Sequence, residues 1–199
     1  MDKKLLFVDT ETTGLSKLTN GIIAISLLVD INGALVDQLT LEINPLSYKR
    51  PIAISPKALE INGYKEEQFA GFLPAREALT SITALMGKYV NKYDAKDKFI
   101  FNAYNSEFDA GFLQELFIDC GSTAYANYLD YRHLDVYALV KYLVHTGAIG
   151  TGYRQTLEAA CKATGITLSD AHNSLSDVLA TRELHHYLVN TYLGGVKCV

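Results

Sequence analysis

The first apolar segment of the chain ends in two carboxylates. The sequence FVDTETTGL over residues 7–15 places Asp9 and Glu11 two positions apart, and side chains alternate along a strand, so both acids are expected on one face. Two acids that project together from a buried strand repel each other unless a cation lies between them. Hard oxygen ligands favour Mg²⁺ or Mn²⁺. The pattern predicts a divalent-metal site at the strand end; its alternative is a polar strand end that runs into a threonine-rich turn.

A third carboxylate, Asp109, ends the segment NAYNSEFD over residues 102–109, which follows a short apolar segment. The pattern predicts that Asp109 lies in the first turn of a helix whose neighbouring positions are apolar. The alternative to a site residue is an acid that stabilises this helix through the helix dipole.

A histidine and a fourth carboxylate lie in the segment DAHNSLSD over residues 170–177, where the last helix is predicted to begin. Five residues rotate an ideal helix by about 140°, so His172 and Asp177 would not share a helix face. We therefore place His172 at the loop–helix junction, from which it can reach a site that Asp177 meets from the helix. The alternative is an exposed capping histidine and a surface aspartate.

The elements that must position these residues begin with strands and continue with helices. Asn32 and Gly33 both tolerate a positive φ and predict a hairpin between the second and third strands. Residues 45–63 contain three of the four prolines and are predicted to form a loop with a short turn of helix. Antiparallel strands followed by interleaved helices indicate an α/β fold, a mixed sheet covered on both faces. Strands are expected over 4–9, 21–30, 34–44 and 99–101, a turn near 121–131, and helices over 74–92, 106–120, 134–143, 155–164 and 171–192.

Composition limits the class of protein. The 199 residues carry a formal net charge of -4 and are 49% hydrophobic, which is typical of one ordinary globular domain over residues 1–199 and not of a basic nucleic-acid binder held by bulk charge. The three cysteines are an odd number without a close pair, so we expect neither a disulfide framework nor a thiolate metal site, and a cytoplasmic location fits best. The apolar run over residues 22–29 is broken by Ser26 and is too short to span a membrane.

Asp9 with Glu11, Asp109, and His172 with Asp177 resemble the three motifs of the DEDDh (DnaQ-like) 3′–5′ exonucleases. This family includes the proofreading epsilon subunit of bacterial DNA polymerase III. The resemblance spans about residues 4–190, and its most specific part is FVDTETTGL. It implies the ribonuclease H-like fold, with a mixed five-stranded sheet and helices on both faces.

The resemblance also implies a mechanism. Asp9, Glu11, Asp109 and Asp177 would hold two Mg²⁺ (or Mn²⁺) ions, Asp109 partly through water, and His172 would take the proton from the attacking water. The product would be a nucleoside 5′-monophosphate released from a free 3′ end. Two such cations would add about four positive charges where phosphate must sit, so the net charge of -4 does not exclude a nucleic-acid substrate.

Three further residues are implied to contact substrate: Thr12 through backbone amides around it, Leu15 against the terminal base, and Asn105 of the second motif. The chain also departs from the family pattern without losing a metal ligand or the base. These departures put nucleotide preference in question, not the reaction type. The positions concerned are Ala24, where glutamate is frequent, Asn62 and Tyr104, where histidine is frequent, and Ser174, where alanine is common.

Two alternatives to a DNA exonuclease stay open at this point. An exoribonuclease that trims RNA 3′ ends or degrades short oligoribonucleotides would have the same motifs, because contact with the 2′-hydroxyl depends on local geometry. A non-catalytic nucleic-acid- or polymerase-binding module would not need all four acids and His172. No clamp-binding peptide is evident and the last predicted helix is followed by few residues, so a free-standing nuclease is favoured over a polymerase-bound one.

Overall fold

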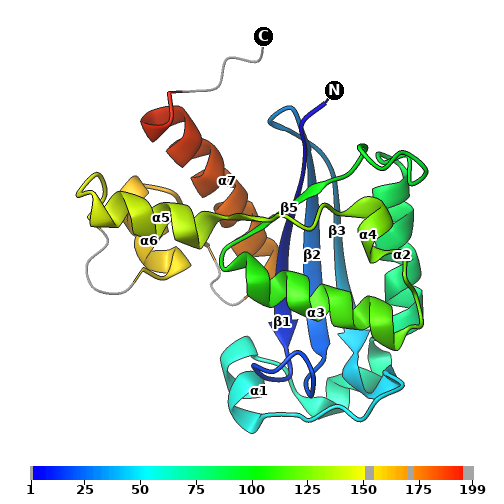
Figure 1. The fold of residues 1–199 in the computed structure, drawn as a ribbon. Helices are drawn as coiled ribbons and strands as arrows, with labels where there is room; N and C mark the ends of the chain where they lie inside the picture. Colours follow the sequence, from blue (N-terminus) through cyan, green and yellow to red (C-terminus); the bar gives the residue numbers. More distant parts are fainter. Residues whose placement is uncertain (1, 151–154, 170–172, 195–199) are drawn as a thin grey trace.

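The computed structural model describes residues 2–150, 155–169 and 173–194. Its sheet has the strand order β4-β3-β2-β1-β5-β6 (Figure 1). β1, β2 and β3 pair antiparallel, whereas β5 pairs parallel to β1, β6 to β5 and β4 to β3. The mixed sheet is confirmed, but the count of five strands is wrong, because two-residue strands such as β4 and β6 are too short to leave a pattern in the sequence. The strands are β1 (Lys4–Thr12), β2 (Ile22–Ile31), β3 (Ala34–Asn44), β4 (Leu73–Pro74), β5 (Ile100–Ala103) and β6 (Leu134–Asp135).

Helices cover both faces of this sheet (Figure 1). On one face, Leu6 and Val8 of β1 belong to a buried cluster that includes residues of α2 and α3. On the other face, Phe7 packs with Leu28 and with Val178 of α7. Alternate residues of β1 therefore point to opposite helical layers. The helices are α1 (Pro56–Asn62), α2 (Ala75–Gly87), α3 (Ser106–Asp119), α4 (Tyr125–Tyr128), α5 (Val136–His145), α6 (Leu157–Thr164) and α7 (Ser174–Tyr192), with 3₁₀ turns over Pro45–Ser47 and Glu66–Gly71.

Most predicted elements are found, and the differences have local causes. The hairpin turn is confirmed, with φ of 55° at Asn32 and 88° at Gly33. The helix expected over 134–143 starts later, because Leu134 and Asp135 pair with β5 and the Asp135 carboxylate then caps α5 by accepting from the amide of Tyr137. The turn near 121–131 contains α4, and the helix from residue 74 ends at Gly87. No helix within the described ranges is long and apolar enough to cross a membrane.

Candidate active site

Three of the predicted carboxylates meet at the end of β1. Asp9 and Glu11 lie on the β1 face that α7 covers, and Asp177 comes from the first turn of α7. One carboxylate oxygen of each lies within 4.8 Å of one from each of the others. Glu11 is buried, and Asp9 and Asp177 are half-buried. The alternation of side chains along β1 and the start of α7 thus bring the first and third motifs together.

Burial and mutual repulsion make these acids hard to ionise. The pKa of Glu11 is raised to about 8, first by burial and then by the charges of Asp177 and Asp109. The pKa of Asp9 is raised well above its usual value by burial and by the three neighbouring acids. A bound cation would favour the ionised forms instead. An all-oxygen donor set with such raised pKa values fits a hard divalent ion such as Mg²⁺ or Mn²⁺.

Asp109 approaches the site from the other face of the sheet. It lies in the first turn of α3, as predicted, and is buried. Its Oδ1 accepts a 2.7 Å hydrogen bond from the hydroxyl of Thr10, the β1 residue between Asp9 and Glu11. Burial raises the pKa of Asp109, and the Thr10 hydroxyl opposes this rise. Asp109 is not within the group of three, so a water-bridged position is compatible with its geometry.

The start of α7 is fixed by polar contacts. Asn173 caps the helix, its side chain accepting from the amides of Leu175 and Ser176 at 3.1 and 3.3 Å. The Ser174 hydroxyl lies 2.9 Å from that of Ser26 in β2. Ser174, where the family commonly has alanine, thus makes a buried hydrogen bond to the sheet. His172, the predicted general base, lies outside the described residues.

The three residues expected to contact substrate surround the carboxylates in different ways. The Thr12 hydroxyl donates to the carbonyl of Gly14 at 2.7 Å. Leu15 is 88% exposed on the loop between β1 and β2, free to contact a ligand. Asn105 is exposed and precedes α3 with φ of 72°. Its backbone N–H donates to the carboxylate of Asp135 at 3.1 Å. Asn105 therefore has a backbone role whatever its side chain does.

Asn62 and Tyr104, at positions where the family often has histidine, both donate side-chain hydrogen bonds to backbone carbonyls. The Asn62 side-chain amide donates to the carbonyl of Thr12 at 3.0 Å, so α1 supports the end of β1. The Tyr104 hydroxyl donates to the carbonyl of Gln155 at 2.6 Å, linking the second motif to the segment before α6.

Two residues near the site were missed from the sequence. Thr10 lies within the first motif, but its contact with Asp109 joins residues 99 positions apart. Tyr64 follows α1, and its pKa is raised to about 12 by burial and by the charges of Glu42 and Glu11. The residue opposite both acids is Ala24 of β2, which pairs with Glu11 and with Glu42. No local pattern indicates Tyr64; its hydroxyl donates to Glu42 at 3.4 Å, and the strand register places Glu42 one strand beyond Ala24 from Glu11.

The sequence model of the RNase T-type exonuclease family matches residues 6–184. The chain belongs to the DnaQ-like 3′–5′ exonuclease family. It is 25% identical over 183 residues to a PolC-type DNA polymerase III of Clostridium perfringens. The aligned region covers 92% of this chain and 11% of that polymerase. The chain therefore corresponds to a small part of that relative.

Solved structures with the same fold include two of Escherichia coli exonuclease I. The complex with a dT13 oligonucleotide has a TM-score of 0.78 and 21% identity, covering 96% of this chain and 42% of exonuclease I. A zinc-bound complex with single-stranded DNA has a TM-score of 0.77 and 20% identity, covering 96% of this chain and 41% of exonuclease I. This exonuclease-family member thus has the ribonuclease H-like fold of these enzymes.

Proposed function

We propose that the chain hydrolyses phosphodiester bonds from the 3′ end of DNA and releases nucleoside 5′-monophosphates. The observation that carries this proposal is the meeting of Asp9, Glu11 and Asp177 within 4.8 Å at the end of a core strand. Family membership gives the reaction class. Exonuclease I, which has the same fold, is found in complex with a dT13 oligonucleotide, and this similarity favours DNA over RNA.

In the proposed mechanism, Asp9, Glu11 and Asp177 would hold two divalent cations, and Asp109, oriented by its hydrogen bond from Thr10, would complete the set. Two Mg²⁺ or Mn²⁺ ions would activate the attacking water and neutralise the leaving 3′-oxygen.

His172 accepts the proton of the attacking water, because an imidazole with an unperturbed pKa of about 6.5 is suited to this work at neutral pH. Leu15 packs against the terminal base, and the backbone around Thr12 together with Asn105 holds the terminal nucleotide. The loop between β1 and β2 that carries Leu15 is anchored by Arg50, whose guanidinium donates to the carbonyls of residues 17, 18 and 20 at 2.8–3.0 Å.

The test is one assay with four matched substrates: DNA and RNA oligomers of the same sequence, each single-stranded and paired. The proposal requires mononucleotides to appear from the 3′ end of DNA with Mg²⁺ or Mn²⁺ and to disappear with a chelator. Faster cleavage of RNA would identify an exoribonuclease instead. No cleavage of any substrate, with binding retained, would identify a non-catalytic module.

We propose a single exonuclease domain over residues 1–199 that acts in the cytoplasm. In the described parts of the chain, Cys120 and Cys161 are buried and unpaired, as expected in a reducing compartment. Partnership with a polymerase is suggested by the PolC relative alone, and co-purification with a replicative polymerase would test it.

A further inference from the structure

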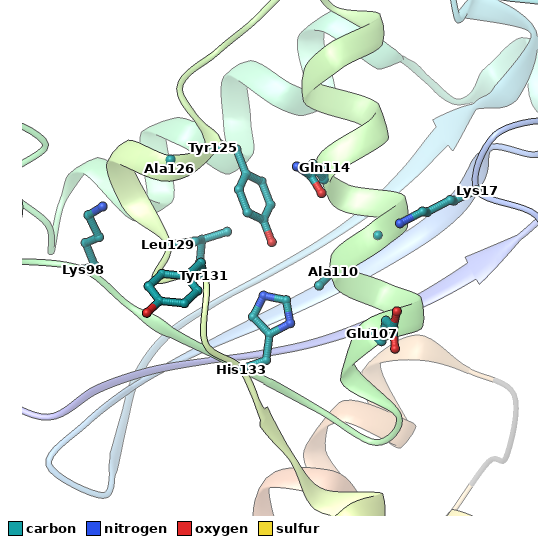
Figure 2. A pocket seen from close by; sticks show the side chains of 11 residues that line it. Lys17, Lys98, Glu107, Ala110, Gln114, Tyr125, Ala126, Leu129, Tyr131 and His133 are labelled. Atoms are coloured by element: carbon teal, nitrogen blue, oxygen red, sulfur yellow. The ribbon is translucent and has the colours of Figure 1, made fainter.

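A groove of about 400 Å³ lies on the outer side of α3, between α3, α4 and the segment that leads to β6 (Figure 2). Lys17 and Lys98 enter its lining from opposite sides, with the rings of Tyr125, Tyr131 and His133 between them (Figure 2). The groove thus combines two cations with aromatic surfaces.

Lys17 belongs to the loop between β1 and β2, residues 13–21, and its side chain extends from that loop to the groove. It follows Leu15 by two residues and lies across α3 at Gly111. A side chain on Gly111 would place its Cβ 2.7 Å from Cδ of Lys17 and 3.1 Å from the ammonium nitrogen. The glycine therefore leaves the space through which Lys17 reaches the groove.

The aromatic walls are ordered by the core beneath them. The ring of Tyr125 meets that of Phe117 edge-on at 5.5 Å, and the ring of His133 lies 5.2 Å from that of Phe101. Tyr131, unlike these two residues, is 81% exposed, and the Arg132 guanidinium lies over its ring, 4.8 Å from the ring centroid. Rings that are held in place and partly exposed can stack on bases at little entropic cost.

The charges of the groove favour an anion. Among the described residues, neither Lys17 nor Lys98 has an ion-pair partner within 4.0 Å. Glu107 is the acid among the lining residues. Asp130 also lies near Lys98, whose charge lowers the pKa of Asp130, but Asp130 is paired with Arg132, so two ammonium groups remain against the one carboxylate of Glu107. Arg132, beside the groove, is paired with Asp130 at 3.1 Å and adds no free charge.

We propose that this groove binds the upstream part of the single strand whose 3′ end occupies the active site, with phosphates on Lys17 and Lys98 and bases against Tyr125 and Tyr131. This inference rests on the proposed nuclease function.

The geometry fixes how far from the 3′ end the groove acts. Glu107 lies about 200° around α3 from Asp109, so the strand must pass the exposed N-terminus of the helix, a path of about one helix diameter, roughly 10 Å. Lys98 lies before β5, about 15 Å along the strand direction from Ala103 at the catalytic end. The groove therefore lies several nucleotides from the 3′ end, and a mononucleotide substrate does not reach it.

The experiment compares the double variant Lys17→Gln/Lys98→Gln with wild type on two substrates. One is the p-nitrophenyl ester of thymidine 5′-monophosphate, which occupies only the active site, and the other is a single-stranded DNA of about ten nucleotides, within the site sizes of single-strand-binding folds. We expect KM for the long substrate to rise at least tenfold with kcat unchanged, and hydrolysis of the ester to be unaltered. Removing two phosphate contacts should also reduce the slope of log KM against log salt by about 1.4.

The control is Lys162→Gln on α6, outside the groove. It removes one positive charge, as each of the two groove substitutions does, and should behave as wild type. Gly111→Ala, which displaces Lys17, should reproduce part of the effect. An unchanged KM for the long DNA in the double variant would overturn the groove proposal while leaving the nuclease intact. A wild-type protein that cleaves neither substrate would instead overturn the proposed function.

Discussion

The hydroxyl of Thr10 donates a 2.7 Å hydrogen bond to Oδ1 of Asp109, joining the first strand to the first turn of α3. Thr10 points to one face of β1 while its neighbours Asp9 and Glu11 point to the other. The strand therefore supplies two carboxylates directly and orients a third through the residue between them. This arrangement makes Thr10 a positioning residue.

Thr10→Val should lower kcat by roughly tenfold at neutral pH, because a hydrogen bond to a charged group is worth about 1.5–3 kcal/mol. The bond favours the ionised form of Asp109, so its loss raises the pKa of Asp109 further. At subsaturating metal, where this carboxyl still titrates, the acid limb of the pH–rate profile should therefore move to higher pH. Thr10→Ser keeps the hydroxyl and should restore both values. A Val variant with an unshifted profile would show that the bond is only structural.

Glu11→Gln should make the metal-free protein more stable at pH 8 than wild type. The folded-state pKa of Glu11 is about 8 against 4.5 for an ordinary glutamate. Folding therefore requires proton uptake between these values, and wild-type stability falls as pH rises through this window. The variant removes this penalty, which is on the order of a few kcal/mol.

Thermal melts in a chelator would check this at pH 4 and pH 8, with the exposed Glu67→Gln as control. The Gln variant and wild type should converge at pH 4, where Glu11 is protonated in both states. Adding Mg²⁺ or Mn²⁺ should raise the Tm of wild type much more than that of Glu11→Gln. A wild-type Tm that is insensitive to both pH and metal would contradict the carboxylate cluster.

The sequence was sufficient to predict the core of the sheet and the shared face of Asp9 and Glu11. Long alternating or apolar segments and the Asn32–Gly33 turn determine β1, β2 and β3 locally. The i, i+2 spacing of Asp9 and Glu11 similarly predicts a shared face without tertiary information.

Contacts between distant segments could not be predicted in this way. The partner of Thr10 is 99 residues away, and that of Ser26 is 148 residues away. Strands β4 and β6 have two residues each, and their pairing depends on where neighbouring elements end. Such contacts depend on packing between elements, which the local sequence does not encode.

Asn105 offers a way to separate backbone strain from substrate contact. Its φ of 72° is costly for most residues but not for glycine. Asn105→Gly should keep the free energy of unfolding within about 1 kcal/mol of the wild-type value, whereas Asn105→Ala should lower it by about 1–2 kcal/mol, as measured by thermal or denaturant unfolding. If the side chain holds the terminal nucleotide, both variants should raise KM alike; a Gly variant with wild-type KM would limit Asn105 to its backbone role.

His172→Ala should reduce kcat by roughly 10²–10⁴-fold at neutral pH, the range typical of a general base. With saturating metal, the carboxylates stay ionised, so the acid limb of the profile near pH 6–7 should report the imidazole. That limb should vanish in the variant while metal-induced stabilisation is retained. Full turnover of His172→Ala at neutral pH would refute its role.

The buried hydroxyls of Ser26 and Ser174 should couple the position of α7 to the sheet. The two oxygens are 2.9 Å apart, and Ser26 also lies 2.9 Å from the hydroxyl of Thr40. Ser174→Ala leaves Ser26 with Thr40 and should cost only about 1 kcal/mol. A double-mutant cycle with Ser26→Ala should give a coupling of about 0.5–1.5 kcal/mol. Because Asp177 follows Ser174 by one helical turn, the cycle should also be run on kcat: a stability coupling without any kinetic coupling would show that the serines hold the helix but do not set the carboxylate.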